Sequence, residues 1–272
     1  MRNGRIISLL NYKEKHQKMK KLENKFAVIT GGAGGIGKAA AELFLKEGAS
    51  VLLVDLKEED LKAAAEELGG KNVEYIAADV SKEDEVKKYA QYAKDKFEHV
   101  DVFFNNAGVE GKIKPITEHP VKEFDHLMGV NVRGTWLGMK FIIPLMREGG
   151  SIINTSSVAG MRGMANLSPY VTSKHGVDGM TRTVALEMAP SKIRVNAINP
   201  SPVDNDMMRS VESGMGGDKP EEARKQFEAM IPLGRYAENK DIADVVLFLA
   251  SEESRFLTGV ILPVDGGMTA KL

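Results

Sequence analysis

The chain has 272 residues, no cysteine, and a formal net charge of −1 from 37 basic and 38 acidic side chains. The balanced charge gives no electrostatic footprint for nucleic acid or for an anionic membrane, and neither is predicted as a partner. The absence of cysteine from the sequence excludes disulfides, thiolate metal sites and cysteine nucleophiles, and it favours a cytoplasmic protein.

The first 18 residues are basic and differ in composition from the rest of the chain. Their apolar patch, Ile6-Ile7 and Leu9-Leu10, is too short for the core of a signal peptide. We therefore expect a disordered N-terminal extension over residues 1–18 and one catalytic domain over 19–272. A targeting or membrane-surface role for the extension is the alternative. No apolar run in the sequence approaches the roughly 18 residues that a membrane-spanning helix needs.

Short apolar and β-branched runs then recur, with helical patterns between them. The runs are continuous rather than alternating, which is typical of strands buried on both faces of a sheet. The predicted strands are Phe26–Thr30, Ser50–Val54, Val73–Ala77, Val100–Phe104, Ser151–Thr155, Ile193–Ile198 and Val260–Val264. Besides a helix that Gly48 ends, helices are predicted over 58–68, 82–97, 121–147, 169–189 and 239–251. This alternation predicts an α/β fold, a doubly wound Rossmann-type parallel sheet of about seven strands with helices on both faces.

Residues 201–234 interrupt this rhythm with a stretch rich in proline, glycine and methionine. The stretch follows the sixth predicted strand, at the carboxyl edge of the sheet, where α/β proteins bind their ligands. We expect a helical lid here, and an ordinary surface excursion is the alternative.

A glycine cluster directly follows the first predicted strand and opens the first helix. Glycines let the backbone approach a pyrophosphate closely, and the helix N-terminus supplies N–H donors and a positive dipole. Gly31, Gly35, Ile36 and Gly37 are therefore candidate dinucleotide-binding residues.

Asp55 ends the second predicted strand, where a carboxylate can accept hydrogen bonds from an adenosine ribose. The same charge repels a 2′-phosphate, so we predict NAD rather than NADP as the cofactor. Lys57, two residues on, is the nearest basic group that could offset this repulsion. A simple turn carboxylate is the alternative role for Asp55.

Tyr170 and Lys174 lie four residues apart, and Ser157 precedes the tyrosine by 13 residues. On a helix such a pair shares one face, and a neighbouring cation lowers the pKa of a phenol. A serine hydroxyl from a strand end could hold a substrate oxygen against that phenol. This arrangement favours proton transfer at a carbonyl or a carbinol, although the tyrosine–lysine spacing also occurs on solvated helix faces.

These motifs, in this order, resemble the short-chain dehydrogenase/reductase family. The resemblance covers roughly residues 20–268, and the residues that carry it are Thr30-Gly31-x-x-x-Gly35-x-Gly37, Asn105-Asn106-Ala107-Gly108, Asn131, Ser157 and Tyr170-x-x-x-Lys174. Family spacing selects Ser157 rather than the adjacent Ser156, which we expect to bond the backbone.

The resemblance implies further residues at the cofactor and at the reaction centre. Asp79 and Val80 match the position that contacts the adenine ring. Asn131 matches an asparagine that joins the catalytic set through a water near Lys174. The resemblance also implies that Lys174 holds the nicotinamide ribose. The remaining residues expected at the dinucleotide are Asn106, Ala107 and Gly108 beside the adenosine ribose, Tyr170, Pro200 and Val203.

The chain departs from the family pattern after its sixth strand. Ser201 stands where a glycine is usual, and Asn205 stands where threonine often bonds the nicotinamide carboxamide. If position 201 needs a positive φ, serine carries a steric cost there.

We therefore predict an NAD(H)-dependent oxidoreductase that interconverts a secondary alcohol and its ketone, with Tyr170 as general acid/base and Ser157, Lys174 and Asn131 completing the catalytic set. Methionines on the expected substrate side suggest an apolar cyclic or alkyl substrate; they are Met161, Met164, Met207, Met208 and Met215. A 3-oxoacyl thioester reductase, a sugar dehydrogenase and a non-enzymatic dinucleotide sensor are the alternatives. No histidine has ligand-like spacing, so no metal is expected. The resemblance also implies a homotetramer that packs through the helices over 121–147 and 169–189 and through Val260–Leu272.

Overall fold

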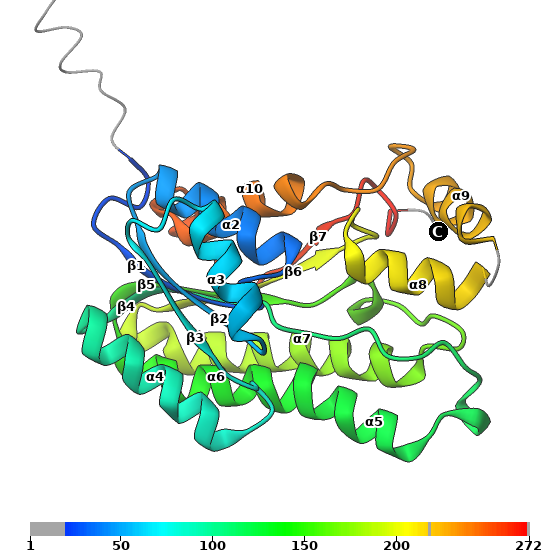
Figure 1. The fold of residues 1–272 in the computed structure, drawn as a ribbon, viewed down its shortest axis with the longest axis horizontal. Helices are drawn as coiled ribbons and strands as arrows, with labels where there is room; N and C mark the ends of the chain where they lie inside the picture. Colours follow the sequence, from blue (N-terminus) through cyan, green and yellow to red (C-terminus); the bar gives the residue numbers. More distant parts are fainter. Residues whose placement is uncertain (1–19, 217–218, 271–272) are drawn as a thin grey trace, which may run out of the picture.

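A computed structural model of the protein describes residues 20–216 and 219–270 (Figure 1). The extension predicted over residues 1–18 lies outside the described residues. Within the described part of the chain, no helix combines the length and the apolar character needed to cross a membrane.

The fold is built on a seven-stranded sheet in the order β3-β2-β1-β4-β5-β6-β7, and every neighbouring pair runs parallel. The strands are β1 (Phe26–Thr30), β2 (Ser50–Asp55), β3 (Val73–Ala77), β4 (Val100–Asn105), β5 (Met146–Thr155), β6 (Arg194–Pro200) and β7 (Ile261–Val264). The chain winds outward in one direction from β1 and in the other from β4. The carboxyl ends of β1 and β4 therefore form the switch point at which such sheets bind their ligands.

Helices cover both faces of the sheet, as the continuous apolar strands predict (Figure 1). One face carries α2 (Gly35–Lys46), α3 (Glu58–Glu67) and α10 (Asn239–Ala250), and the other carries α4 (Glu83–Phe97), α6 (Thr135–Ile142) and α7 (Ser168–Met188). Within β1, Ala27 and Ile29 pack into the first of these layers and Val28 into the second, because successive side chains of a strand point to opposite faces. The doubly wound α/β prediction is confirmed.

The continuous helix predicted over 121–147 is wrong. The segment divides into α5 (Val121–Met128), a π-helical turn over Gly129–Gly134, α6, and a 3-10 turn over Ile143–Leu145. The Thr135 hydroxyl donates to the Asn131 carbonyl oxygen at 2.7 Å, inside the π-helical stretch. Pro144 has no N–H to continue the helix, and β5 begins at Met146, which pairs with Val100. Three further 3-10 turns, η4 (Val158–Gly160), η5 (Ala189–Ser191) and η6 (Glu252–Ser254), connect later elements, and η1 (Ile116–Glu118) precedes α5.

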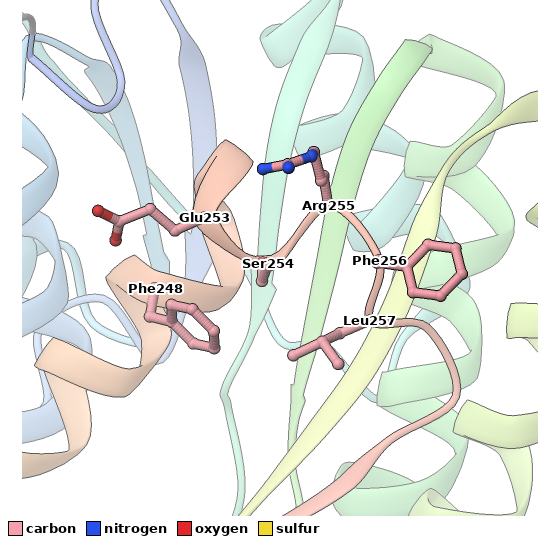
Figure 2. Close-up of a pocket in the computed structure, with 6 residues that line it drawn as sticks. All are labelled: Phe248, Glu253, Ser254, Arg255, Phe256 and Leu257. Atoms are coloured by element: carbon pink, nitrogen blue, oxygen red, sulfur yellow. The ribbon is translucent and has the colours of Figure 1, made fainter.

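An apolar surface lies where α10 leads through η6 toward β7. Phe248 and Leu257 line a shallow pocket there, and the Phe256 side chain is 100% exposed beside it (Figure 2).

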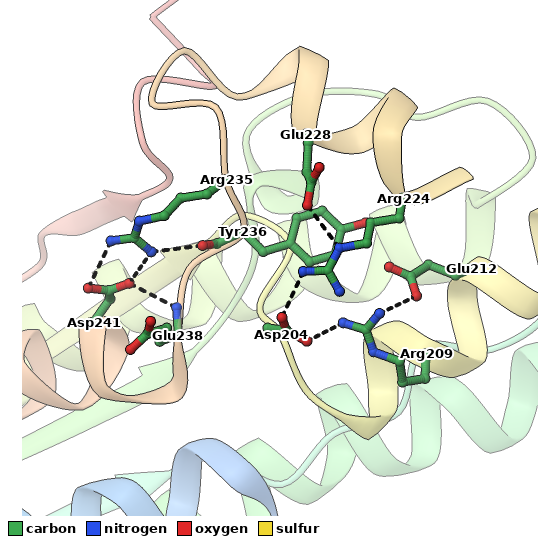
Figure 3. A network of polar contacts seen from close by, with 9 residues as sticks. All are labelled: Asp204, Arg209, Glu212, Arg224, Glu228, Arg235, Tyr236, Glu238 and Asp241. Atoms are coloured by element: carbon green, nitrogen blue, oxygen red, sulfur yellow. Dashed lines mark hydrogen bonds and ion pairs between the residues drawn. The ribbon is translucent and has the colours of Figure 1, made fainter. Parts of the chain in front are cut away.

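Two helices, α8 (Asp206–Gly216) and α9 (Pro220–Met230), lie beyond the carboxyl end of β6 (Figure 1). Charged groups tie them to each other: Asp204 accepts hydrogen bonds from Arg209 and Arg224, and Arg209 also binds Glu212 at 2.6 Å (Figure 3). A small apolar cluster attaches the pair to the domain, and it consists of Val158, Met208, Phe227, Ile231, Tyr236 and Met268. Val158 directly follows Ser157, so this cluster packs the two helices against the turn that begins at Ser157.

Candidate active site

The structure brings Tyr170, Lys174 and Ser157 together at the carboxyl end of β5. Tyr170 and Lys174 occupy the first turns of α7, and the Lys174 ammonium lies 5.5 Å from the centre of the Tyr170 ring. Ser157 caps the turn that follows β5, and its Oγ accepts a hydrogen bond from the Ala159 amide at 3.2 Å. The three predicted groups therefore form one cluster.

Lys174 is buried, with 4% of its surface exposed, and its Nζ donates to the Thr155 carbonyl oxygen at 3.0 Å. Burial disfavours the ammonium and lowers the pKa of Lys174 to about 8, although the Asp178 carboxylate opposes this shift. The lysine can therefore change its charge close to neutral pH, unlike an exposed lysine.

Burial also dominates at the tyrosine, where it raises the pKa of the Tyr170 phenol. A hydrogen bond with Ser157 acts in the lowering direction, and the charge of Glu110 raises the pKa further. Lys174 is not among the groups that shift this pKa in the structure, so its expected effect on the acidity of the phenol stays a prediction. The ammonium lies over the ring and is bonded to a backbone carbonyl, while burial disfavours the phenolate. Burial therefore favours the neutral form of the Tyr170 phenol.

Asn131 lies within the π-helical turn, and its side chain is fully engaged. Its Oδ1 accepts from the Val109 amide at 2.8 Å, and its Nδ2 donates to the Val109 carbonyl oxygen at 2.9 Å and to Ser173 Oγ at 3.1 Å. A Cβ on Gly108 would lie 3.2 Å from Asn131 Oδ1 and 3.5 Å from Lys174 Nζ. Asn131 thus fixes the loop after β4 against α7, close to Lys174. Its role in a water relay stays a prediction.

The loop between β1 and α2 has the form of an anion cradle. Gly34 caps α2 without any side-chain hydrogen bond, and the first turn of α2 holds no acidic residue. Gly31 has φ of 65°, and a Cβ there would lie 2.9 Å from Asn106 Nδ2, so only glycine fits. A Cβ on Gly37 would overlap the Gly31 carbonyl oxygen. Open amides and the positive helix end fit the pyrophosphate of a dinucleotide.

Thr30, which sequence reasoning did not assign a separate role, anchors the predicted segment Asn106–Gly108 beside this cradle. Its Oγ1 accepts hydrogen bonds from the amides of Asn106 at 2.9 Å and Ala107 at 3.1 Å. A polar side chain closing a buried strand is the signal that could have identified it.

Asp55 ends β2 and lies directly against the glycine loop. Its Oδ2 accepts from the Ala33 amide at 3.1 Å, and its Oδ1 accepts from the Leu56 amide at 2.8 Å. Lys57 lies 4.0 Å from the Asp60 carboxylate, which gives this lysine a partner other than Asp55. The Asp55 carboxylate therefore lies against the glycine loop, and Lys57 is paired with a different carboxylate.

Asp79 and Val80 lie just beyond β3. The Asp79 Oδ1 accepts hydrogen bonds from the Ser81 amide at 3.0 Å and the Ser81 hydroxyl at 2.7 Å. Val80 is buried, and a Cβ on Gly134 would lie 2.9 Å from its Cγ2. Both residues are held at the same edge of the sheet as Asp55, because these strands are neighbours and parallel.

The segment after β6 corrects one expectation. Ser201 does not lie in the left-handed region of backbone space, so its side chain carries no steric cost there. Asn205 Oδ1 accepts from the Met208 amide at 3.2 Å, so this side chain begins α8. Pro200 and Val203 are buried on either side of Ser201.

The predicted methionines divide between two environments. Met161, Met207 and Met215 are exposed, whereas Met208 is buried in the cluster that attaches α8 and α9 to the domain. Among residues 20–216 and 219–270, no group of three or more histidine, aspartate or glutamate side chains is placed to hold a metal ion.

The lowered pKa of Lys174 predicts a specific pH dependence of stability. The unfolded chain binds a proton up to about pH 10.5, but the folded protein releases it near pH 8, so stability rises with pH between these values. Replacing Lys174 with methionine removes this rise. Between about pH 7 and about pH 9.5, the free energy of unfolding of the wild type should gain about 2 kcal/mol relative to Lys174→Met. Urea unfolding at each pH measures it, and parallel curves for the two proteins would contradict the assignment.

The sequence is similar to those of known proteins. Levodione reductase from Leifsonia aquatica is 38% identical over 253 residues, which cover 91% of this chain and 95% of that protein. Cyclohexanol dehydrogenase from an Acinetobacter species is 34% identical over 256 residues, which cover 92% and 97% of the two chains.

Solved structures agree with the sequence relatives. A crystal structure of levodione reductase superimposes with a TM-score of 0.89 at 38% identity and covers 92% of this chain and 100% of that one. A 3-ketoacyl-(acyl-carrier-protein) reductase from Brucella melitensis, complexed with NADH, gives a TM-score of 0.83 at 35% identity, covering 91% and 99%.

The family described as "Enoyl-(Acyl carrier protein) reductase" (adh_short_C2) matches residues 31–269, from the glycine loop to the turn after β7. This match spans nearly the whole domain and includes each cluster described above. The chain is an oxidoreductase that belongs to the short-chain dehydrogenase/reductase family.

Proposed function

We propose that the protein interconverts a secondary alcohol and its ketone, with NAD(H) as the second substrate and Tyr170 as the general acid/base. The observation that carries the proposal is the cluster of Ser157, Tyr170 and the buried Lys174 ammonium at the carboxyl edge of the sheet. The glycine cradle at the end of β1 opens onto the same edge.

The proposed chemistry divides between the cofactor and three side chains. Bound NAD(H) supplies the acceptor or donor of the hydride. Ser157 and Tyr170 hydrogen-bond the substrate oxygen from two sides. In oxidation Tyr170 takes the hydroxyl proton as the carbinol loses its hydride, and in reduction it returns a proton to the forming alkoxide. The Lys174 charge stabilises the Tyr170 phenolate, which is the form that takes the proton in oxidation and the form that reduction leaves behind.

The proposed cofactor-binding residues follow from the glycine loop and from the family resemblance. Gly31, Gly35, Ile36 and Gly37 would hold the pyrophosphate, and Asp55 would hold the adenosine ribose. The segments on either side of this path would complete the site: Asp79 and Val80 at the adenine, Asn106, Ala107 and Gly108 at the adenosine ribose, and Tyr170, Lys174, Pro200 and Val203 at the nicotinamide end. The Brucella relative complexed with NADH supports a nicotinamide dinucleotide.

Cyclic alcohols and ketones are the proposed substrate class. The similarity to cyclohexanol dehydrogenase supports this class. Exposed Met161 and Met207, near the site in sequence, offer adaptable apolar surface for a ring. The similarity to the Brucella reductase makes a 3-oxoacyl thioester the second candidate. Parallel assays with cyclohexanol, a sugar and a 3-hydroxyacyl thioester discriminate among these classes.

We also propose that the protein assembles as a homotetramer. Phe256 is fully exposed on the segment between η6 and the edge strand β7, and it lines a shallow pocket together with Phe248 and Leu257 (Figure 2). On α6, the Trp136 side chain is 48% exposed and lines a second shallow pocket with Met180 of α7. Two separate apolar surfaces are what a tetramer with two kinds of contact requires.

Replacing Tyr170 with phenylalanine removes the proton donor and keeps the ring. We expect kcat to fall by about 10²- to 10⁴-fold in both directions, with NADH affinity changed by less than about threefold. Steady-state rates and NADH fluorescence titration measure the two quantities. Tyr92→Phe is the matched control, since Tyr92 bonds Glu74 far along the chain from the site. Near-normal turnover by Tyr170→Phe would contradict the assignment of Tyr170 as the general acid/base.

Replacing Asp55 with serine removes the charge that repels a 2′-phosphate. A like-charge contact costs several kcal/mol, so the ratio of kcat/KM for NADP over NAD should rise by about tenfold or more. The exposed Asp60 offers a control, because Asp60→Ser removes a carboxylate from the same region without touching the glycine loop. An unchanged ratio in Asp55→Ser contradicts the assignment of the ribose site.

Sedimentation velocity tests the assembly. The native protein should sediment near four times the 29.7 kDa of the chain. Phe256→Ser should shift it to a smaller species, while Ile116→Ser, a change at another exposed apolar side chain, should not. A monomeric native protein contradicts the tetramer.

A further inference from the structure

Asp178 is a buried carboxylate next to the reaction centre that the proposed chemistry does not use. It lies one helical turn after Lys174 on α7, and only 3% of its surface is exposed. Aspartate is almost never fully buried unless another group compensates its charge. Its presence at this position therefore needs a reason.

The hydrogen bonds of Asp178 lead to the catalytic serine. Its Oδ2 accepts from Asn199 Nδ2 at 3.0 Å, and the same nitrogen donates to the Ser157 carbonyl oxygen at 2.7 Å. Asn199 lies in β6 and is fully buried. One amide group thus links the carboxylate on α7 to the backbone of Ser157.

The surroundings of Asp178 leave little freedom for this link. A Cβ on Gly160 would lie 2.6 Å from Asp178 Oδ2 and 2.6 Å from Ser156 Oγ. Ser156 Oγ in turn donates to the Lys174 carbonyl oxygen at 3.1 Å. Asp178 therefore joins three elements at one point: the helix that carries Lys174, the turn that carries Ser157, and β6.

Hydrogen bonding alone does not account for a carboxylate at this position. Its partner Asn199 is neutral, and its other oxygen, Oδ1, is buried without a hydrogen-bond partner. An asparagine could accept the same bond from Asn199 without the cost of burying a charge. What the carboxylate adds is a negative charge.

The negative charge of Asp178 can stabilise the buried ammonium of Lys174. Three charged or titratable groups of α7 interact electrostatically with Asp178: Lys174, His175 and Arg182. The groups that face it from β6 and from the turn after β5, Asn199 and Ser156, are neutral. His175 and Arg182 are exposed to solvent, so their fields are screened.

We propose that Asp178 is a positioning residue, which holds Ser157 through Asn199 and keeps Lys174 in its charged form. The catalytic part of this inference rests on the proposed function. Burial raises the pKa of Asp178 and lowers that of Lys174, and the Asp178 charge opposes the second shift. Without that charge the ammonium would lose its proton at a lower pH.

Asp178→Asn tests the charge and preserves the shape and the bond to Asn199. Without cofactor, the rise in the free energy of unfolding that Lys174 causes should begin at a lower pH in Asp178→Asn than in the wild type. The onset should shift by roughly half a pH unit or more. This difference should vanish when Lys174→Met is present in both proteins. Urea unfolding of the four proteins across the alkaline range measures the coupling without any substrate.

The pH profile of kcat/KM supplies the second readout. Loss of activity at high pH should shift by the same amount to lower pH in Asp178→Asn. A purely structural role would instead lower the rate equally at every pH. The control is Asp101→Asn, since Asp101 is also buried, at 4% exposure, but it bonds Phe26 and Arg147 at the amino-terminal edge of the sheet. This control should lose stability and keep the profile unshifted.

An Asp178→Asn protein whose unfolding shows no coupling to Lys174 and whose profile superimposes on the wild type overturns the inference. A wild type without turnover on any substrate class contradicts the proposed function instead. In that case the unfolding measurements alone test the coupling between Asp178 and Lys174, because they need no substrate.

Discussion

The burial of one ammonium group is the constraint on which the rest of the site depends. Lys174 has a single hydrogen-bond acceptor in the described structure, the Thr155 carbonyl at the end of β5, and only 4% of its surface is exposed. Removing a charge from water costs several kcal/mol unless other groups compensate it. The core packing of α7 and the sheet must supply that energy. The buried lysine therefore lowers stability, and the proposed function gives a reason for its presence.

The same edge of the sheet concentrates other unfavourable features. The loop between β1 and α2 holds backbone geometry that only glycine tolerates and leaves helix amides without side-chain caps. Asp178 adds a buried carboxylate oxygen without a partner. Each feature costs stability, and each lies at the carboxyl ends of parallel strands, where the fold collects ligand-binding groups. The opposite edge is different, because Asp101 there pairs with Lys25 and Arg147.

Local patterns account for what could be predicted from the sequence. Continuous apolar runs identified the strands of the parallel sheet, and the glycine loop, Tyr170 and Lys174 were recognisable from spacing. Contacts distant in sequence account for the rest. The bonds of Asn131 to Val109 and the pairing of Met146 with Val100 interrupt a helix that periodicity extends. The link between Asp178 and Asn199 joins elements that no local pattern connects. The pKa of Tyr170 depends on burial, which spacing does not reveal.

The most direct test of the account follows the hydride itself. The native protein would be incubated with NAD and cyclohexanol carrying deuterium at the carbinol carbon. The account predicts that NADH and cyclohexanone form in equal amounts and that the deuterium appears in the NADH. The same incubation would be repeated with other deuterated secondary alcohols. If NAD binds but none of them yields labelled NADH, the central claim of alcohol–ketone interconversion is contradicted.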